Sequence, residues 1–143
     1  FTAFSGADFD NYIFMFANIK PANNIVSLSC RTSTDGGSTY DSGASDYIYV
    51  LNGASSTTTD GITITGAMSN AASSYGFSGT VSLYGPHLTA KTRLASSGMV
   101  DSGREARVVG ERISAADVDA VRFYMGAGNI DSGTITMYGM RND

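Results

Sequence analysis

A chain of 143 residues with 42% hydrophobic residues, 7 phenylalanines and 8 tyrosines has enough apolar material for a packed core, which excludes a disordered chain. Charged residues make up only 15% of it, against roughly 25% in an average soluble domain, and the net charge is −4. The length and apolar content predict one globular domain over residues 1–143. Because basic residues are few, the chain lacks the positively charged surface typical of nucleic-acid-binding proteins, and we expect it to bind no nucleic acid.

The strongest strand pattern comes first, over residues 10–19. Both of its faces are apolar, with Tyr12 and Phe14 on one and Ile13 and Met15 on the other. A strand of this kind is expected to be covered on both sides, or to lie between the core and a neighbouring subunit.

Further short runs with alternating polarity follow, separated by Gly, Asn, Ser and Pro. The first of them, residues 25–32, comes after a turn and is expected to pair with the first strand. More strands are predicted over residues 46–51, 61–65, 79–84, 88–96 and 104–113, the last with a bulge at Gly110.

The C-terminal stretch, residues 120–140, predicts two strands around a turn rich in Gly, Asn, Asp and Ser. We expect it to form a hairpin that closes the sheet. The side chains that are expected to face inward are Val121, Phe123, Met125, Ile135 and Met137.

Eight or nine short strands at near-regular spacing, and no run with the apolar period of an ordinary helix, predict an all-β fold. We expect an antiparallel β-sandwich that is jelly-roll-like. Parallel α/β folds are excluded because they need crossover helices.

No stretch of the chain contains a recognisable catalytic motif. The single cysteine, Cys30, is in phase with Val26 and Leu28 and is expected to be a core residue. The single histidine, His87, follows a proline in a predicted loop. The longest apolar run, Tyr12 to Ala17, is too short for a membrane-spanning helix, which needs about 20 residues. We therefore expect no enzyme, no cofactor and no membrane insertion.

The stretch Ser33 to Tyr40 fits the pattern Ser-x-Asp-x-Gly-x-Thr-aromatic and resembles the Asp-box hairpin of sialidase-type β-propellers. A propeller needs several such blades, and the motif occurs once here, so we interpret it as a turn held by Asp35. Asp35, Asp41 and Asp46 lie close in sequence, as the oxygen ligands of Ca²⁺ often do. Turn-forming aspartates explain the same residues, and no metal site is predicted.

Tyrosines offer a flat apolar ring with a polar tip, which suits sugar stacking and subunit packing. Several lie at strand ends or opposite the aliphatic face of a strand. The alternative interpretation is that they are ordinary, half-buried tyrosines of a sandwich surface. The candidates for an interface or glycan-binding face are Tyr40, Tyr47, Tyr49, Tyr84 and Tyr124.

Three segments together resemble a family of small β-sandwich virion proteins from tailed phages and gene transfer agents, of tail-fibre, head-spike or decoration type. They are Phe9–Phe14, Arg31–Gly43 and Gly133–Arg141. The family commonly opens with Tyr/Phe-Asp-x-Tyr and ends with Gly-x-hydrophobic-x-Leu-Tyr-Gly and a basic residue; here Met137 stands in place of the Leu.

The resemblance implies a structural protein at the virion surface that assembles with other virion proteins. We further expect a homo-oligomer, with a trimer as one option, because a neighbouring subunit would cover the doubly apolar first strand. Contact with host-surface carbohydrate belongs to the same hypothesis. The resemblance carries no catalytic residue. The alternative is a carbohydrate-binding module of a secreted or surface protein.

Overall fold

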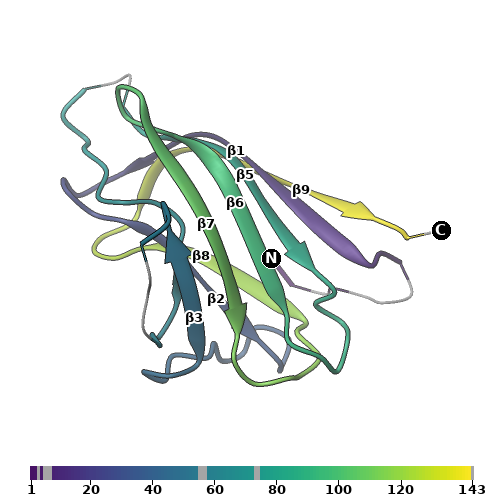
Figure 1. Cartoon of the computed structure of the whole chain (residues 1–143). Coiled ribbons are helices and arrows are strands. Elements are labelled where there is room, and N and C mark those ends of the chain that lie inside the picture. Colours follow the sequence, from purple (N-terminus) through teal and green to yellow (C-terminus); the bar gives the residue numbers. More distant parts are fainter. Residues whose placement is uncertain (3, 5–7, 55–57, 73–74, 143) are drawn as a thin grey trace.

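The computed structural model describes residues 1–2, 4, 8–54, 58–72 and 75–142. These residues form nine strands and no helix, and the strands make two antiparallel sheets that face each other (Figure 1). The strands are β1 (Asn11–Pro21), β2 (Leu28–Ser33), β3 (Tyr47–Leu51), β4 (Ile62–Thr63), β5 (Phe77–Tyr84), β6 (Arg93–Val100), β7 (Arg104–Arg112), β8 (Ala120–Met125) and β9 (Ile130–Met140).

The larger sheet has the order β3-β7-β6-β5-β1-β9 and the smaller one β4-β2-β8. Three of the pairings are nested, because β1 pairs with β9, β2 with β8 and β3 with β7, all antiparallel. Nested pairs are what a long hairpin gives when it rolls into two sheets. The predicted all-β, jelly-roll-like sandwich with eight or nine strands is confirmed.

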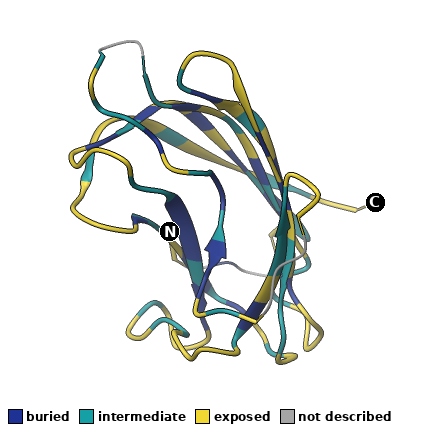
Figure 2. Cartoon of the chain, turned by 60° about the vertical axis from the view of Figure 1, so that its left-hand side comes forward, coloured by how far each residue is buried: buried dark blue, intermediate teal, exposed yellow. Residues whose placement is uncertain are grey.

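The core lies between the two sheets and is built from one face of each (Figure 2). On β1, Tyr12, Phe14 and Phe16 are buried. Facing them from the small sheet are Leu28 of β2 and Val121 of β8, both fully buried. The period of two that identifies each strand in the sequence therefore also determines which of its side chains enter the core.

The predicted pairing of the first two strands is wrong. β1 pairs with β5 and β9, whereas β2 pairs with β4 and β8 in the other sheet. The link between them, residues 22–27, crosses from one sheet to the other, and within it Val26 is tied to Met68 by hydrogen bonds in both directions. A short polar link fits either a hairpin or a crossing between facing sheets.

The prediction that residues 120–140 form a closing hairpin is also wrong, although both of the predicted strands exist. β8 lies in the small sheet and β9 at the edge of the large sheet, so residues 126–129 carry the chain across the sandwich. Val121 and Met125 are buried as expected, and Phe123 and Ile135 pack against the core. Met137 remains 37% exposed, because an edge strand has a neighbour on one side only.

Two local predictions on β6 and β7 also need correction. The strand expected at residues 88–96 is β6, which begins and ends later, at Arg93 and Val100. No bulge occurs at Gly110, which keeps regular register with Tyr49 on one side and Leu94 on the other. A Cβ atom at Gly110 would lie 2.9 Å from that of Tyr49, so the glycine allows a close approach of β7 to β3.

The turn after β2 has the structure that the Asp35 motif predicts. The Asp35 carboxylate accepts hydrogen bonds from the Ser33 hydroxyl (2.7 Å), the Thr39 amide (2.8 Å) and the Thr39 hydroxyl (2.6 Å). These bonds, that from the Thr39 hydroxyl first, lower the pKa of Asp35 to about 2. The turn therefore favours the charged form of the Asp35 carboxylate.

A pH effect follows from this turn. The pKa of Asp35 falls from 3.8 to about 2 on folding, so its contribution is present above pH ~4 and lost as the pH falls through ~2. We expect Asp35→Asn to lower the free energy of unfolding at neutral pH and to flatten its decline between those pH values. Denaturant titrations across this range measure both effects. Asp117→Asn, at an exposed carboxylate, is the control; parallel acid profiles for wild type and Asp35→Asn would contradict the assignment.

Candidate functional site

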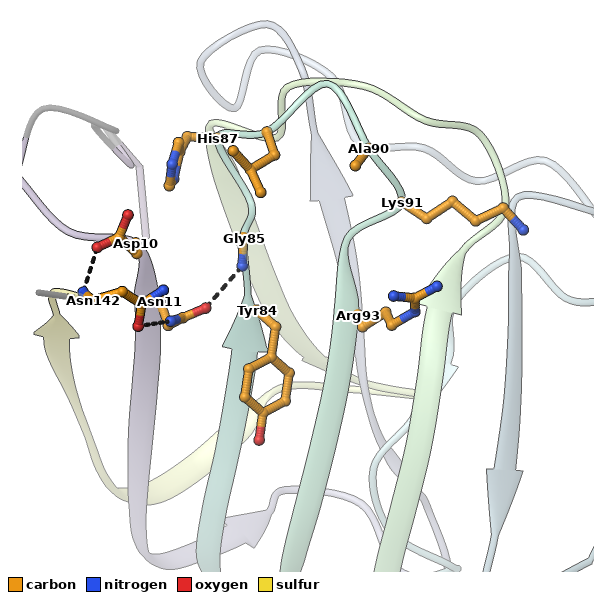
Figure 3. Close-up of a pocket in the computed structure, with 10 residues that line it drawn as sticks. Asp10, Asn11, Tyr84, Gly85, His87, Ala90, Lys91, Arg93 and Asn142 are labelled. Atoms are coloured by element: carbon orange, nitrogen blue, oxygen red, sulfur yellow. Dashed lines mark hydrogen bonds between the residues drawn. The ribbon is translucent and has the colours of Figure 1, made fainter.

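A pocket of about 290 Å³ opens at one end of the large sheet, where β1 begins, β5 ends and β6 begins (Figure 3). Its walls come from segments far apart in the sequence, including the loop between β5 and β6 and the end of the chain after β9. The side chains that give it its chemistry are Asp10, Asn11, Tyr84, His87, Lys91 and Asn142.

Hydrogen bonds fix the polar wall of the pocket. The Asn11 side chain donates to the Asn142 side-chain oxygen (3.1 Å) and accepts from the Gly85 amide (3.0 Å). The backbone N–H of Asn142 donates to the Asp10 carboxylate (2.6 Å). This network ties the start of β1 to the end of β5 and to the C-terminal segment, so the amide and carboxylate groups are held in place before any ligand arrives.

Tyr84 supplies the apolar surface of the pocket, and this residue is 45% exposed on the outer face of the sheet. On the far side stand the cationic groups of Lys91 and Arg93, both of which contact Glu111, at 2.7 Å and 3.3 Å. The hydrogen bond from Lys91 is the main reason that the pKa of Glu111 lies below its usual value. An exposed ring beside fixed amides and charges can bind a small polar ring through stacking and hydrogen bonds.

His87 lies at the rim of this pocket, half-buried and not in open solvent. Its Nδ1 atom is buried and has no hydrogen-bond partner within the described residues. Buried ring nitrogens nearly always have a hydrogen-bond partner, so this atom is an exception among the polar groups of the pocket.

The described residues contain no arrangement that suggests nucleophilic catalysis. Cys30 is 1% exposed, and burial raises the pKa of its thiol to about 12, so it is a core residue as predicted. The three aspartates discussed as metal ligands do not converge. Asp35 closes its own turn, Asp46 accepts from the Gly43 amide, and Asp41 pairs with Arg112 at 2.7 Å. No group of three or more metal-ligating side chains occurs among the residues that the structure describes.

Tyr40 and Tyr124, two of the predicted tyrosines, meet on the outer face of the small sheet. The guanidinium carbon of Arg122 lies 4.6 Å from the ring centre of Tyr40 and 5.4 Å from that of Tyr124. On the other side of Tyr124 lies Arg31, at 4.9 Å, which also forms an ion pair with Asp60. Both tyrosines are half-buried, and the stack is separate from the pocket at Tyr84.

Tyr47 does not belong to a binding face, which corrects its assignment, whereas Tyr49 is half-buried and lines a second pocket of about 290 Å³ with Ile48 and Val109. Both point inward from β3, while Ile48 and Val50 alternate to the outside. Tyr47 is 0% exposed, and Tyr49 is packed against the core cluster. Of the five predicted tyrosines, Tyr84 alone lines the first pocket, and the structure does not bring the five together.

A second surface feature is the outer face of the large sheet over β5, β1 and β9. Over residues 11–17, 78–84 and 134–140 its outward side chains are uncharged, and several are apolar and exposed, including Met15 at 50% and Tyr138 at 52%. Cross-strand neighbours on this face are Met15 with Thr80 and Thr136, and Ile13 with Ser82 and Tyr138. The second apolar face of the first strand, noted in the sequence, is therefore not covered by any described element of this chain.

Sequence reasoning identified Tyr84 but missed most of its companions in the pocket. Asp10, Asn11 and Asn142 are ordinary polar residues at strand ends, and nothing local marks them as neighbours. Only the pairing of β1 with both β5 and β9 brings them together. His87 lies in a loop, as the sequence predicts, and this loop folds onto the pocket.

Comparison with known protein families, with curated proteins and with solved structures finds no match to this chain. The described part of the chain contains no helix long and apolar enough to cross a membrane.

Proposed function

We propose that this chain is a non-enzymatic structural domain of a virion, at a fibre, spike or decoration position on the particle surface, where it assembles with neighbouring subunits. The observation that carries the proposal is the uncharged part of the outer face, over residues 11–17 of β1, 78–84 of β5 and 134–140 of β9, which continues to an unpaired sheet edge. Exposed apolar side chains on a charge-free face are typical of surfaces that become covered.

The amino-acid sequence also supports a virion protein. Low charge content and many Gly, Ser and Thr residues accompany the motifs that resemble virion proteins of tailed phages and gene transfer agents. A surface of that composition stays in solution through neutral polar groups and still packs closely against another protein.

The test is to locate the chain. Particles purified from the producing cells are fractionated, and the chain is followed by mass spectrometry and by immunogold labelling of intact particles. We expect it to sediment with particles and to be labelled on their outside. A chain found only in the free protein fraction would contradict the proposal.

A second candidate function, carbohydrate binding, is favoured by the pocket at Tyr84. A half-exposed ring beside fixed amide, carboxylate and ammonium groups suits a single sugar unit, and a volume near the lower end of the range for ligand pockets suits a small ligand. The same pocket serves a virion protein that contacts host-surface glycan or a carbohydrate-binding module of a secreted protein.

We expect Tyr84→Ala to weaken glycan binding by more than about tenfold, roughly 1.4 kcal/mol, because the stacking surface is lost. A glycan array followed by calorimetry on the best ligand measures this. Tyr138→Ala is the matched control, since Tyr138 is exposed to a similar extent, 52% against 45%, and lies outside the pocket. Equal losses from both variants, or binding that survives in Tyr84→Ala, would rule out the pocket as the sugar site.

A further inference from the structure

The four edge strands of the two sheets differ in how far other parts of the described chain cover them. The edge of β8 is covered by the N-terminal residues, because Phe1 and Val121 exchange backbone hydrogen bonds of 2.9 and 3.0 Å. The edge of β3 is covered in the same way by Thr59, whose backbone pairs with that of Tyr47. β4 has only two residues.

β9 is the exception. It is 11 residues long, lies at the rim of the large sheet beside β1, and has no strand on its other side within the described chain (Figure 1). A long edge offers a row of unpaired N–H and C=O groups, which proteins usually protect with charges, prolines or bulges. Between Thr134 and Met140, β9 has no charge and no proline, and its register with β1 is regular.

We propose that β9 pairs antiparallel with β9 of a second copy of this chain, about a twofold axis at Thr136, so that the two large sheets become one continuous sheet. The proposal rests on the assembly role argued above and identifies the surface that performs it. A twofold axis makes the same edge serve both partners, which is the usual arrangement in dimers.

The sequence of β9 is complementary to itself in this register. With Thr136 opposite its own copy, the residue count brings each Asp131 to the level of the partner's Arg141, which directly follows β9. Asp131 lies where the register of β9 with β1 shifts, and the Arg141 Nε donates to the Asp8 carbonyl at 2.6 Å, so in the proposed dimer these two side chains adjust to form the ion pair twice. Neither Asp131 nor Arg141 has an oppositely charged partner within the described residues of one chain.

The side chains between the two charges also match. Ile135 lies opposite the partner's Met137 on the inner face, where Met137 is still 37% exposed in the single chain. Thr134 lies opposite the partner's Tyr138 on the outer face, a favourable combination of β-branched and aromatic residues. Moving the axis to Ile135 would instead put Asp131 opposite Gly139, so the charges select Thr136.

The register is tested by disulfide cross-linking in the full chain. Directly opposed residues in an antiparallel pair have Cα atoms about 4.5–5.5 Å apart, within the range that a disulfide spans. We expect Thr136→Cys to form a covalent dimer under mild oxidation. Thr134→Cys should not, because in this register its copies are four residues out of step, roughly 13 Å along the strand. Thr80→Cys, exposed on the outer face away from the edge, is the second control, and the buried Cys30 stays silent.

The charges are tested by reversal. We expect Asp131→Arg and Arg141→Asp each to weaken the dimer at least about tenfold in sedimentation equilibrium, because like charges then face each other twice. The double variant should restore the dimer, since an arginine at position 131 then lies opposite an aspartate at position 141 of the partner. Restoration is a result that simple misfolding does not produce.

The outcomes separate this proposal from the proposed function. A chain that sediments as an oligomer or with particles, but whose Thr136→Cys variant gives no covalent dimer, overturns the β9 pairing and leaves the assembly role. A chain that is monomeric at micromolar concentration and absent from particles overturns both. Cross-linking at Thr134 or Thr80 in place of Thr136 overturns the register and with it the proposal.

Discussion

Replacing Phe14 with alanine is expected to lower the free energy of unfolding by about 3–5 kcal/mol, the range for large-to-small changes of buried aromatic residues. Phe14 is 0% exposed at the middle of β1. Its ring packs edge-on against Phe123 of the small sheet (5.0 Å between ring centres) and against Phe1 and Phe4 of the N-terminal segment (5.1 and 6.3 Å). One side chain therefore joins β1, β8 and the residues that cover the edge of β8.

A domain of this size is stable by about 5–15 kcal/mol, so such a loss would leave the variant marginal at room temperature. Urea denaturation followed by far-UV circular dichroism measures it. Met15→Ala is the matched control, because Met15 is the next residue along β1, on the outer face and 50% exposed. Its cost should stay near that of a surface change, within about 0.5 kcal/mol. A larger loss from Met15→Ala than from Phe14→Ala would reverse the inner and outer faces assigned to β1.

Strand β1 explains why the sequence predicts which face of a strand is buried better than it predicts which strands pair. Alternation in residues 10–19 places Tyr12, Phe14 and Phe16 on one face wherever the strand is located, since the period of two is local. Its pairing with β5 and β9 depends on residues about 70 and 120 positions further along, and no short-range pattern contains that information. The two incorrect pairings, β1 with β2 and β8 with β9, join strands that are consecutive in the chain but lie in different sheets.

The residues of the pocket at Tyr84 are even harder to predict from local sequence than the strand pairings. Tyr84 was recognisable as an aromatic residue at a strand end, but the amides around it come from both ends of the chain. Asn11 and Asn142 are hydrogen-bonded to each other across the sheet although they are distant in sequence. A site assembled from strand ends can be located only once the strand order is known.

Tyr47 failed as a surface prediction for a physical reason that can itself be tested. Its hydroxyl accepts a hydrogen bond from the Thr32 backbone amide (2.8 Å), lies 3.1 Å from the Thr32 hydroxyl, and donates to the Asp41 carbonyl (3.3 Å). Burial raises the pKa of Tyr47 to about 12, so the phenol keeps its proton at neutral pH. A tyrosine in a β-strand suits this buried role as well as it suits a ligand-binding face, and composition alone does not separate the two.

We expect Tyr47→Phe to lower the free energy of unfolding by about 1–3 kcal/mol, because the Thr32 amide would be left buried without an acceptor. The hydroxyl links β2 of the small sheet to β3 of the large one, so its removal weakens the contact between the sheets with little change in core volume. Tyr49→Phe is the control: it lies two residues along the same strand, also faces inward, and its hydroxyl has no hydrogen bond to the described residues. Equal stability losses in the two variants would show that the Tyr47 hydroxyl does not stabilise the sandwich. A loss confined to Tyr47→Phe would support the assignment. If that loss is smaller when Thr32→Val is already present, the stabilisation comes from the contact between Tyr47 and Thr32.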